Sequence, residues 1–145
     1  MATINEILAV KGRHLNTISP QATVYEAAVL MNEHKIGSLL VLRDGRLVGI
    51  FTERDILRRI VADQRDPATT RVGDVMTRDV AYGRPETDVE DARSMMKNLR
   101  IRHLPVLGEN GEVVGVISIG DLNALQVNNQ ERTIHQLQEY IHGTW

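Results

Sequence analysis

An internal repeat is the sequence feature that most constrains how this chain can fold. Displaced by 65 residues, segment 23–42 falls on 88–107, and displaced by 66 residues, segment 45–56 falls on 111–122. Identical residues meet at Pro20, Val24, Ala27, Met31, Ile36, Leu39, Val41, Leu42, Gly45, Val48, Gly49 and Asp55. Self-similarity at a fixed spacing indicates copies of one structural unit. The sequence therefore predicts two equivalent repeats.

Each repeat is predicted to contain a short extended stretch, a helix, a β-hairpin and a second helix. In the first repeat, Thr23 and Glu26 form a capping-box pattern, and apolar residues then recur at helical spacing. The segment GSLLVLRDGRLVGIF has two apolar runs around an Asp-Gly turn, a typical hairpin pattern. The extended stretches are expected at 15–18 and 79–83, and the second helices at 52–62 and 118–125.

These elements predict a domain organisation of two packed units. Because a unit of about 50 residues buries little core alone, we expect the repeats to pack face to face with pseudo-twofold symmetry. We place the first repeat at 7–62, a polar linker at 63–71 and the second repeat at 72–127. An amphipathic helix is expected within 128–145, and a short helix over 3–9 with a capping box of Thr3 and Glu6.

Composition excludes several classes of function. A net charge of −2 and an aromatic content of 3% do not support nucleic-acid binding. Cysteine is absent, which excludes disulfides, thiolate metal sites and thiol catalysis. The histidines show no paired metal-ligand spacing. No apolar run reaches membrane-spanning length and MATINEILAVKGR lacks signal-peptide features, so we expect a cytoplasmic protein that does not bind membranes.

Two similar motifs close the two hairpins, GIFTERD at Gly49–Asp55 and GVISIGD at Gly115–Asp121. Each has a hydroxyl residue three positions before an aspartate, where a strand is expected to pass into a helix. One interpretation is helix capping, which needs no ligand. The other is a ligand site, because free amides at a helix start attract phosphate and a carboxylate can accept from both hydroxyls of a ribose. The glycines would leave space for a ring or a backbone to approach.

The duplicated motifs, with the strand segments IGSLLVL and IRHLPVL, resemble the CBS domain family, named after cystathionine β-synthase. The resemblance is to a stand-alone tandem pair of the bacterial type and spans roughly Ile7–Leu125. It implies an α+β fold of two β-α-β-β-α repeats, with small mixed sheets, in a disc-like module that is often dimeric. It also implies clefts between the repeats for adenosine-containing molecules: AMP, ADP, ATP, NAD or S-adenosylmethionine. Such members act in energy or metabolite sensing and signal transduction.

The candidate nucleotide-binding residues follow from the motifs and from this resemblance. The motifs contribute Thr52, Arg54, Asp55, Ser118 and Asp121, and neighbouring segments contribute Thr17, Ile18, Ile36, Gly37, Val80, Tyr82, Arg102, His103, Leu104 and Pro105. Alternation along a strand favours only one of Arg102 and His103 as facing the nucleotide. The resemblance favours the Asp121 site as the better formed, with Arg54 near the phosphates. Lys11 and Arg13 are weaker phosphate candidates.

Three classes of function remain to be weighed. The leading hypothesis is a non-catalytic sensor that binds an adenosine-containing ligand between the repeats. The alternative is a ligand-free dimeric interaction module that regulates a partner protein. An enzyme is disfavoured, because the sequence contains no Walker motif, no GxGxxG fingerprint and no nucleophile–base pair. No catalytic cofactor is expected, and the apolar face of the terminal helix favours a homodimer.

Overall fold

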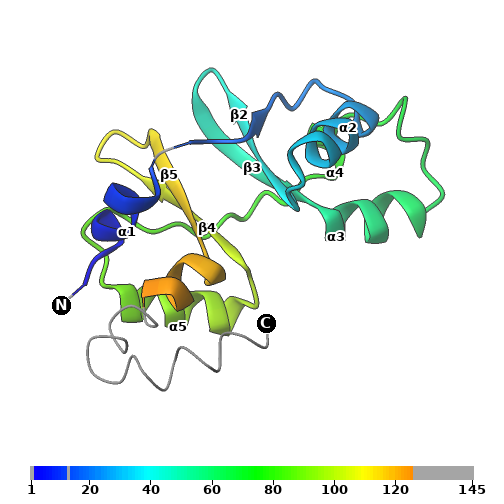
Figure 1. Ribbon diagram of the computed structural model, residues 1–145. Coiled ribbons are helices and arrows are strands. Elements are labelled where there is room, and N and C mark those ends of the chain that lie inside the picture. The colour runs from blue at the N-terminus through cyan, green and yellow to red at the C-terminus, as the bar shows by residue number, and fades with distance from the viewer. Residues whose placement is uncertain (1, 13, 126–145) are drawn as a thin grey trace.

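The computed structural model describes residues 2–12 and 14–125. The first repeat contains β1 (Thr17–Ile18), α2 (Val24–His34), β2 (Ser38–Arg43) and β3 (Arg46–Thr52). Strand β1 pairs parallel to β2, and β2 pairs antiparallel to β3, so this sheet is mixed as expected. The helix after β3 starts as α3 (Glu53–Asp55) and continues with π-helical geometry as η1 (Ile56–Val61). These elements lie together in Figure 1.

The second repeat contains α5 (Val89–Leu99), β4 (His103–Leu107), β5 (Val113–Ser118) and a helix over 119–125. Its sheet differs from the predicted mixed sheet, because β4 and β5 form an antiparallel pair and a parallel partner remains only as a bridge between Gly83 and Val106. In the first repeat, the Leu40 amide donates to the Asn16 carbonyl. The matching position is Pro105, which has no N–H to donate, so this hydrogen bond cannot form.

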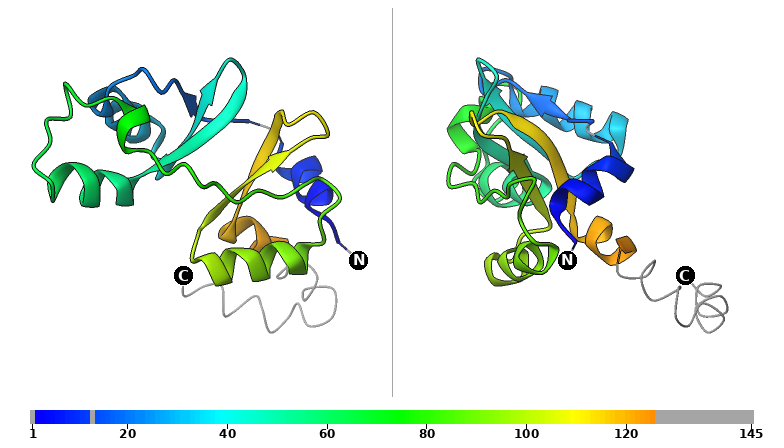
Figure 2. Two further views of the ribbon diagram at one scale, coloured as in Figure 1. Left: turned by 180° about the vertical axis from the view of Figure 1, so that it is seen from behind. Right: turned by 90° about the vertical axis from the view of Figure 1, so that its left-hand side faces the viewer.

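Each repeat completes its core with a helix from outside its own sequence. The first core takes Val72, Val75 and Met76 from α4 (Val72–Val75) and its end. The second core takes Ile4, Ile7 and Leu8 from α1 (Ile4–Lys11). The views of Figures 1 and 2 show α1 beside β4 and β5, and α4 beside β2 and β3. The repeats are therefore tied together by an exchange of helices.

The motif glycines allow this exchange. A Cβ atom at Gly49 would lie 2.5 Å from Met76 Sδ, and one at Gly115 would lie 2.6 Å from Leu8 Cδ2. Such distances are far below van der Waals contact, so each glycine leaves room for a side chain of the exchanged helix. The sequence predicts that this space admits a ring or a backbone. It is filled instead by the protein's own core.

The capping predictions had different outcomes. Thr23 caps α2 as expected, because its hydroxyl accepts from the Glu26 amide at 3.1 Å. The predicted capping box at Thr3 is wrong, because the Thr3 side chain makes no capping hydrogen bond. The first amides of α1 donate instead to the carbonyls of Thr87 and Pro85, which belong to the second repeat. Helix α1 is thus capped by the repeat that it covers.

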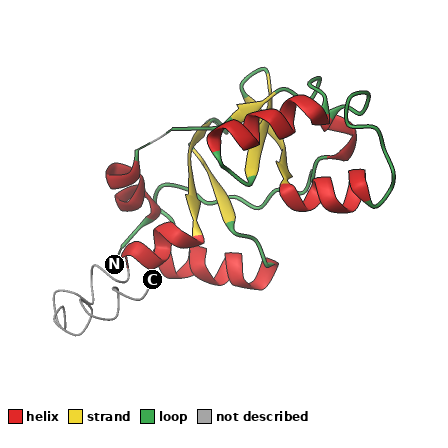
Figure 3. Ribbon diagram, turned by 45° about the vertical axis from the view of Figure 1, so that its right-hand side comes forward, coloured by secondary structure: helices red, strands yellow, loops and turns green. Residues whose placement is uncertain are grey.

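In Figure 3 the helices lie toward the outside of the molecule and the strands between them. No helix among residues 2–12 and 14–125 is long and apolar enough to cross a membrane. The amphipathic helix predicted within 128–145 lies outside the described residues.

The helix exchange predicts that Leu8, although it lies at the start of the first repeat, stabilises the core of the second. Its side chain is 1% exposed. Leu8→Ala should lower the free energy of unfolding by about 2–5 kcal/mol, measured by urea denaturation. The neighbouring variant Val10→Ala is the control, because Val10 is 92% exposed and its truncation should change stability by less than about 0.5 kcal/mol. Equal small effects for both variants would contradict the exchanged core.

Candidate functional site

Both motifs form complete helix caps, which confirms the capping interpretation. The Thr52 hydroxyl accepts from the Asp55 amide at 3.2 Å, and Asp55 Oδ2 accepts from the Thr52 amide at 3.0 Å. Ser118 and Asp121 make the same reciprocal pair at 3.1 and 2.7 Å. The amides of Glu53 and Ile119 donate to backbone carbonyls of the preceding loops. Most of the amides expected to attract a phosphate are therefore already in use.

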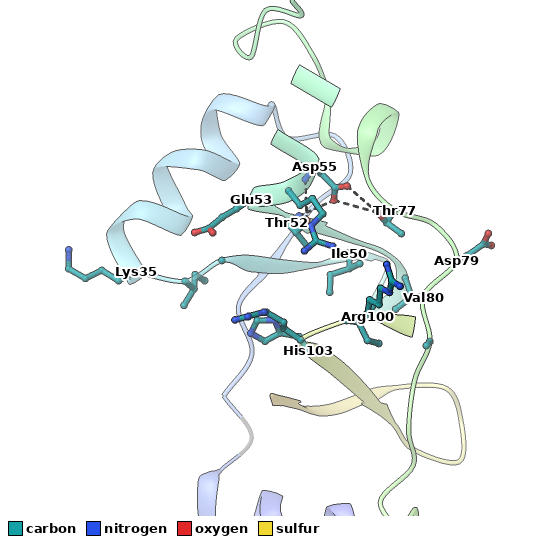
Figure 4. Close-up of a pocket in the computed structure, with 16 residues that line it drawn as sticks. Lys35, Ile50, Thr52, Glu53, Asp55, Thr77, Asp79, Val80, Arg100 and His103 are labelled. Atoms are coloured by element: carbon teal, nitrogen blue, oxygen red, sulfur yellow. Dashed lines mark hydrogen bonds between the residues drawn. The ribbon is translucent and has the colours of Figure 1, made fainter. Parts of the chain in front are cut away.

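A cavity of about 600 Å³ lies between the two repeats, beside the first motif. Figure 4 shows many of the side chains that line it. Its lining comprises Lys35, Ile36, Gly37, Ile50, Thr52, Glu53, Arg54, Asp55, Thr77, Asp79, Val80, Ala81, Arg100, Ile101, Arg102 and His103. The lining thus combines an apolar group of residues from both repeats with several cationic side chains.

Asp55 is held in one orientation at the wall of this cavity. Its side chain is buried, and besides the cap it accepts from the Thr77 hydroxyl at 3.2 Å. Arg59 Nε lies 3.9 Å from Asp55 Oδ1 and provides a counter-charge. The Arg59 guanidinium also donates to the carbonyls of Val75 and Met76, and Arg59 is not among the lining residues. The carboxylate is therefore fixed from behind while it still reaches the cavity.

Exposed cationic side chains surround the cavity. Arg54 follows the first motif's threonine on α3, and Arg102 precedes β4. Lys35 and Arg100 occupy equivalent positions in the two repeats, where each ends a helix in the left-handed conformation with φ of 54° and 57°. Figure 4 shows the charged ends of Lys35 and Asp79 turned outward on opposite sides. The lining carries these four cations against the carboxylates of Glu53, Asp55 and Asp79, so positive charge is in slight excess, which favours an anionic ligand.

A smaller hollow of about 240 Å³ lies beside the second motif. It is lined by Lys11, Gly12, His14, Asn16, Ile36, Ser38, Leu40, His103, Val116 and Ser118. Ile36 and His103 therefore belong to the walls of both cavities. Asp121 lines neither cavity, and its Oδ2 forms an ion pair with Lys11 Nζ at 2.6 Å.

The charges near the second motif shift two pKa values. Burial alone raises the pKa of Asp121, but the hydrogen bonds from Lys11 and Ser118 and the Lys11 charge outweigh it, so the net pKa is lowered. Burial lowers the pKa of His103, the charges of Lys11 and Arg102 lower it further, and Asp121 opposes them. Neutral imidazole is therefore favoured at His103 in the folded, ligand-free chain.

The structure brings about half of the predicted binding residues into the larger cavity. These are Ile36, Gly37, Thr52, Arg54, Asp55, Val80, Arg102 and His103, while Ser118 lines the smaller hollow. Both Arg102 and His103 line the larger cavity, although strand alternation favoured only one. The resemblance places Arg54 near a ligand held by Asp121, but in the structure Arg54 lines the larger cavity and Asp121 lines neither.

Five other predicted residues lie away from both cavities. Leu104 is fully buried in the second core, and Pro105 is buried beside it on β4. Ile18 packs against the first core, and Thr17 is exposed on β1. Tyr82 is 43% exposed, with Arg84 lying 5.5 Å from its ring centre.

Several cavity residues were missed by the sequence analysis. Lys35 and Arg100 are basic residues at matching positions in the repeat, and that match was a signal that could have identified them. Thr77 had no such signal, because its contact with Asp55 depends on the helix exchange. Within residues 2–12 and 14–125, no group of three or more histidine, aspartate or glutamate residues is arranged to hold a metal ion.

The comparisons with known proteins identify the family. The CBS domain model matches residues 9–62 and 72–127. The chain belongs to the CBS domain family. CBS domain-containing protein YhcV of Bacillus subtilis is 40% identical over 114 residues, covering 79% of this chain and 80% of YhcV. This chain is therefore a tandem CBS pair, a type of regulatory module.

Solved structures of CBS proteins have the same fold. A protein with CBS domains from Burkholderia ambifaria has a TM-score of 0.83 and 39% identity, with 92% of this chain and 99% of that chain covered. The CBS domain protein PAE2072 from Pyrobaculum aerophilum, complexed with AMP, has a TM-score of 0.74 and 28% identity, covering 83% of this CBS pair and 89% of that chain.

The lowered pKa of His103 predicts a pH-dependent stability for the ligand-free CBS pair. Because the unfolded chain binds the imidazole proton more tightly, stability should fall as pH decreases below about 6.5, the ordinary pKa of histidine. Urea unfolding between pH 8 and pH 5 should show a shallower decrease for His103→Gln than for the wild type. His34→Gln, at an exposed position on α2, should retain the wild-type slope. Identical slopes for all three proteins would contradict this assignment.

Proposed function

We propose that this CBS pair binds an adenosine-containing nucleotide in the cavity beside Thr52 and Asp55 and acts as a non-catalytic sensor. The observation that carries the proposal is the composition of this one cavity. A fixed carboxylate, an apolar group and several cations line the same space, which suits the ribose, the base and the phosphates of a nucleotide. Its volume of about 600 Å³ lies within the range of small-molecule sites.

Each part of the nucleotide has suitable partners. The oxygens of Asp55 can accept from the two hydroxyls of a ribose. Ile36, Val80 and Ile101 provide apolar surface on which adenine can lie. Arg54 and Arg102 provide the positive charge for phosphates, in place of the helix amides, which are already occupied.

The relative from Pyrobaculum aerophilum that was solved with AMP supports AMP as the first nucleotide to test. ADP, ATP and NAD share the adenosine group, and their additional phosphates would extend toward the exposed cations at the cavity edge. Identity of 28% leaves room for a different preference in this chain.

Binding of a ligand in this cavity would depend on how the two repeats are arranged relative to each other. The cavity is lined by the first motif and also by residues 100–103 of the second repeat. A nucleotide that contacts both repeats binds best to one arrangement of them and therefore shifts the population toward it. We propose that this shift is the signal passed to a regulated protein in the cytoplasm.

One observation favours the alternative, a ligand-free dimeric interaction module. Large apolar side chains are exposed on two helices of the first repeat: Tyr25 is 59% exposed, Val29 38%, Leu57 62% and Val61 63%. They stand four positions apart on α2 and on η1, so each pair lies on one helix face. A homodimer would cover such a face.

The nucleotide proposal predicts stabilisation by ligand. A thermal-shift panel of AMP, ADP, ATP, NAD and S-adenosylmethionine should give at least one clear increase in Tm. A nucleotide at 100 times its Kd adds about 2.7 kcal/mol to the free energy of unfolding. Arg54→Gln should weaken binding at least several-fold, because it removes a charge next to the phosphates. Asp55→Asn should abolish most of it by losing an acceptor for the ribose.

Arg58→Gln is the matched control, because Arg58 is exposed on η1 and is not among the cavity residues. It should bind as the wild type does. No stabilisation by any nucleotide at millimolar concentration would overturn the proposal. If, in addition, Leu57→Glu with Val61→Glu converted a dimer into a monomer in analytical ultracentrifugation, the interaction module would be favoured.

A further inference from the structure

We infer that Lys11 limits the chain to one bound nucleotide, because its ammonium group binds the aspartate of the second motif and competes there with a ligand. This inference rests on the proposed function, because it treats the second motif as a copy of the nucleotide-binding first motif. The second motif repeats the reciprocal cap and the aspartate of the first, and it has a smaller hollow beside it. What differs is the partner of the aspartate.

Lys11 binds one carboxylate oxygen of Asp121 that a ribose hydroxyl could use. Its Nζ lies 2.6 Å from Asp121 Oδ2 and also donates to the Val116 carbonyl at 2.8 Å. The same carboxylate oxygen accepts from the Ser118 amide at 2.7 Å. A ribose hydroxyl would therefore have to compete with a full positive charge, which binds a carboxylate more strongly than a neutral hydroxyl does.

The two aspartates are paired with their cations in opposite ways. Asp55 lines its cavity, whereas its counter-ion Arg59 is absent from the lining and bonds to carbonyls at the end of α4. Lys11 lines the smaller hollow, whereas Asp121 is absent from that lining. Arg59 thus binds Asp55 from outside the larger cavity, whereas Lys11 binds Asp121 from a position in the lining of the smaller hollow.

The exchanged helix holds Lys11 at this position. Leu8 stands one turn before Lys11 on α1 and is 1% exposed, packed over the glycine of the second motif. The Gly12 amide donates to the Leu8 carbonyl and ends the helix directly after Lys11. The hollow of about 240 Å³ is smaller than the roughly 300–1,000 Å³ of typical ligand sites. Removal of the ammonium group would enlarge it and free Asp121.

The test is the number of AMP molecules bound per chain, measured by equilibrium dialysis at saturating AMP. Wild type should bind one. Lys11→Met, which keeps much of the aliphatic stem without the charge, should bind two. The added equivalent should disappear in Lys11→Met combined with Asp121→Asn and persist in Lys11→Met combined with Arg54→Gln. Lys97→Met is the control, since Lys97 is exposed on α5 away from both hollows, and it should bind one.

The outcomes separate this inference from the proposed function. A folded Lys11→Met protein that binds no more AMP than the wild type overturns the inference and leaves a functional first motif intact. Weaker binding by Lys11→Met would also overturn it, because Lys11 would then be a ligand rather than a competitor. If the wild type binds no AMP but Lys11→Met binds one through Asp121, the inference stands and the proposal for the first motif fails. Circular dichroism of each variant checks that it is folded.

Discussion

The packing of Leu8 over Gly115 and of Met76 over Gly49 is the contact on which the rest of the structure depends. Each apolar side chain belongs to a helix that precedes the opposite repeat, and each fills a space that only glycine leaves. This crossed packing brings the segment after α4 alongside the first motif and the segment after α1 alongside the second. Residues at the ends of these two helices therefore contribute a partner to each motif aspartate, Lys11 at the end of α1 and Thr77 shortly after α4.

Those residues give the two motifs different chemistry within the same architecture. After α4, the neutral hydroxyl of Thr77 donates a hydrogen bond to Asp55, and the Asp55 carboxylate still lines the larger cavity. At the end of α1, the charged ammonium group of Lys11 forms an ion pair with Asp121. Lys11, and not Asp121, lines the smaller hollow. Duplication has preserved the caps, the glycines and the hairpins, while a difference outside the motifs separates the two sites.

Comparison of the chain with itself was sufficient to predict the repeat, and local patterns predicted the hairpins and the caps within the repeats, because a hairpin or a cap depends on residues only a few positions apart. The exchange of helices was not predictable in this way, since Lys11 meets a partner 110 positions later in the chain. The sequence favoured the Asp121 motif, whereas the larger of the two described cavities lies beside Asp55. Leu104 and Pro105 line neither cavity because β4 is buried over three consecutive residues, a pattern that alternation along a strand does not predict.

The crossed helices also have a consequence for synthesis of the chain. The first core is complete once Met76 has emerged from the ribosome, but Ile4, Ile7 and Leu8 wait for partners as far along as Leu122. At roughly 5–20 residues per second, that delay lasts about 5–20 s. During this time the apolar face of α1 has no core of its own to enter. Until the second repeat is made, the nascent chain therefore exposes an apolar segment. A chaperone can bind this segment, and so can a neighbouring chain on the same messenger RNA.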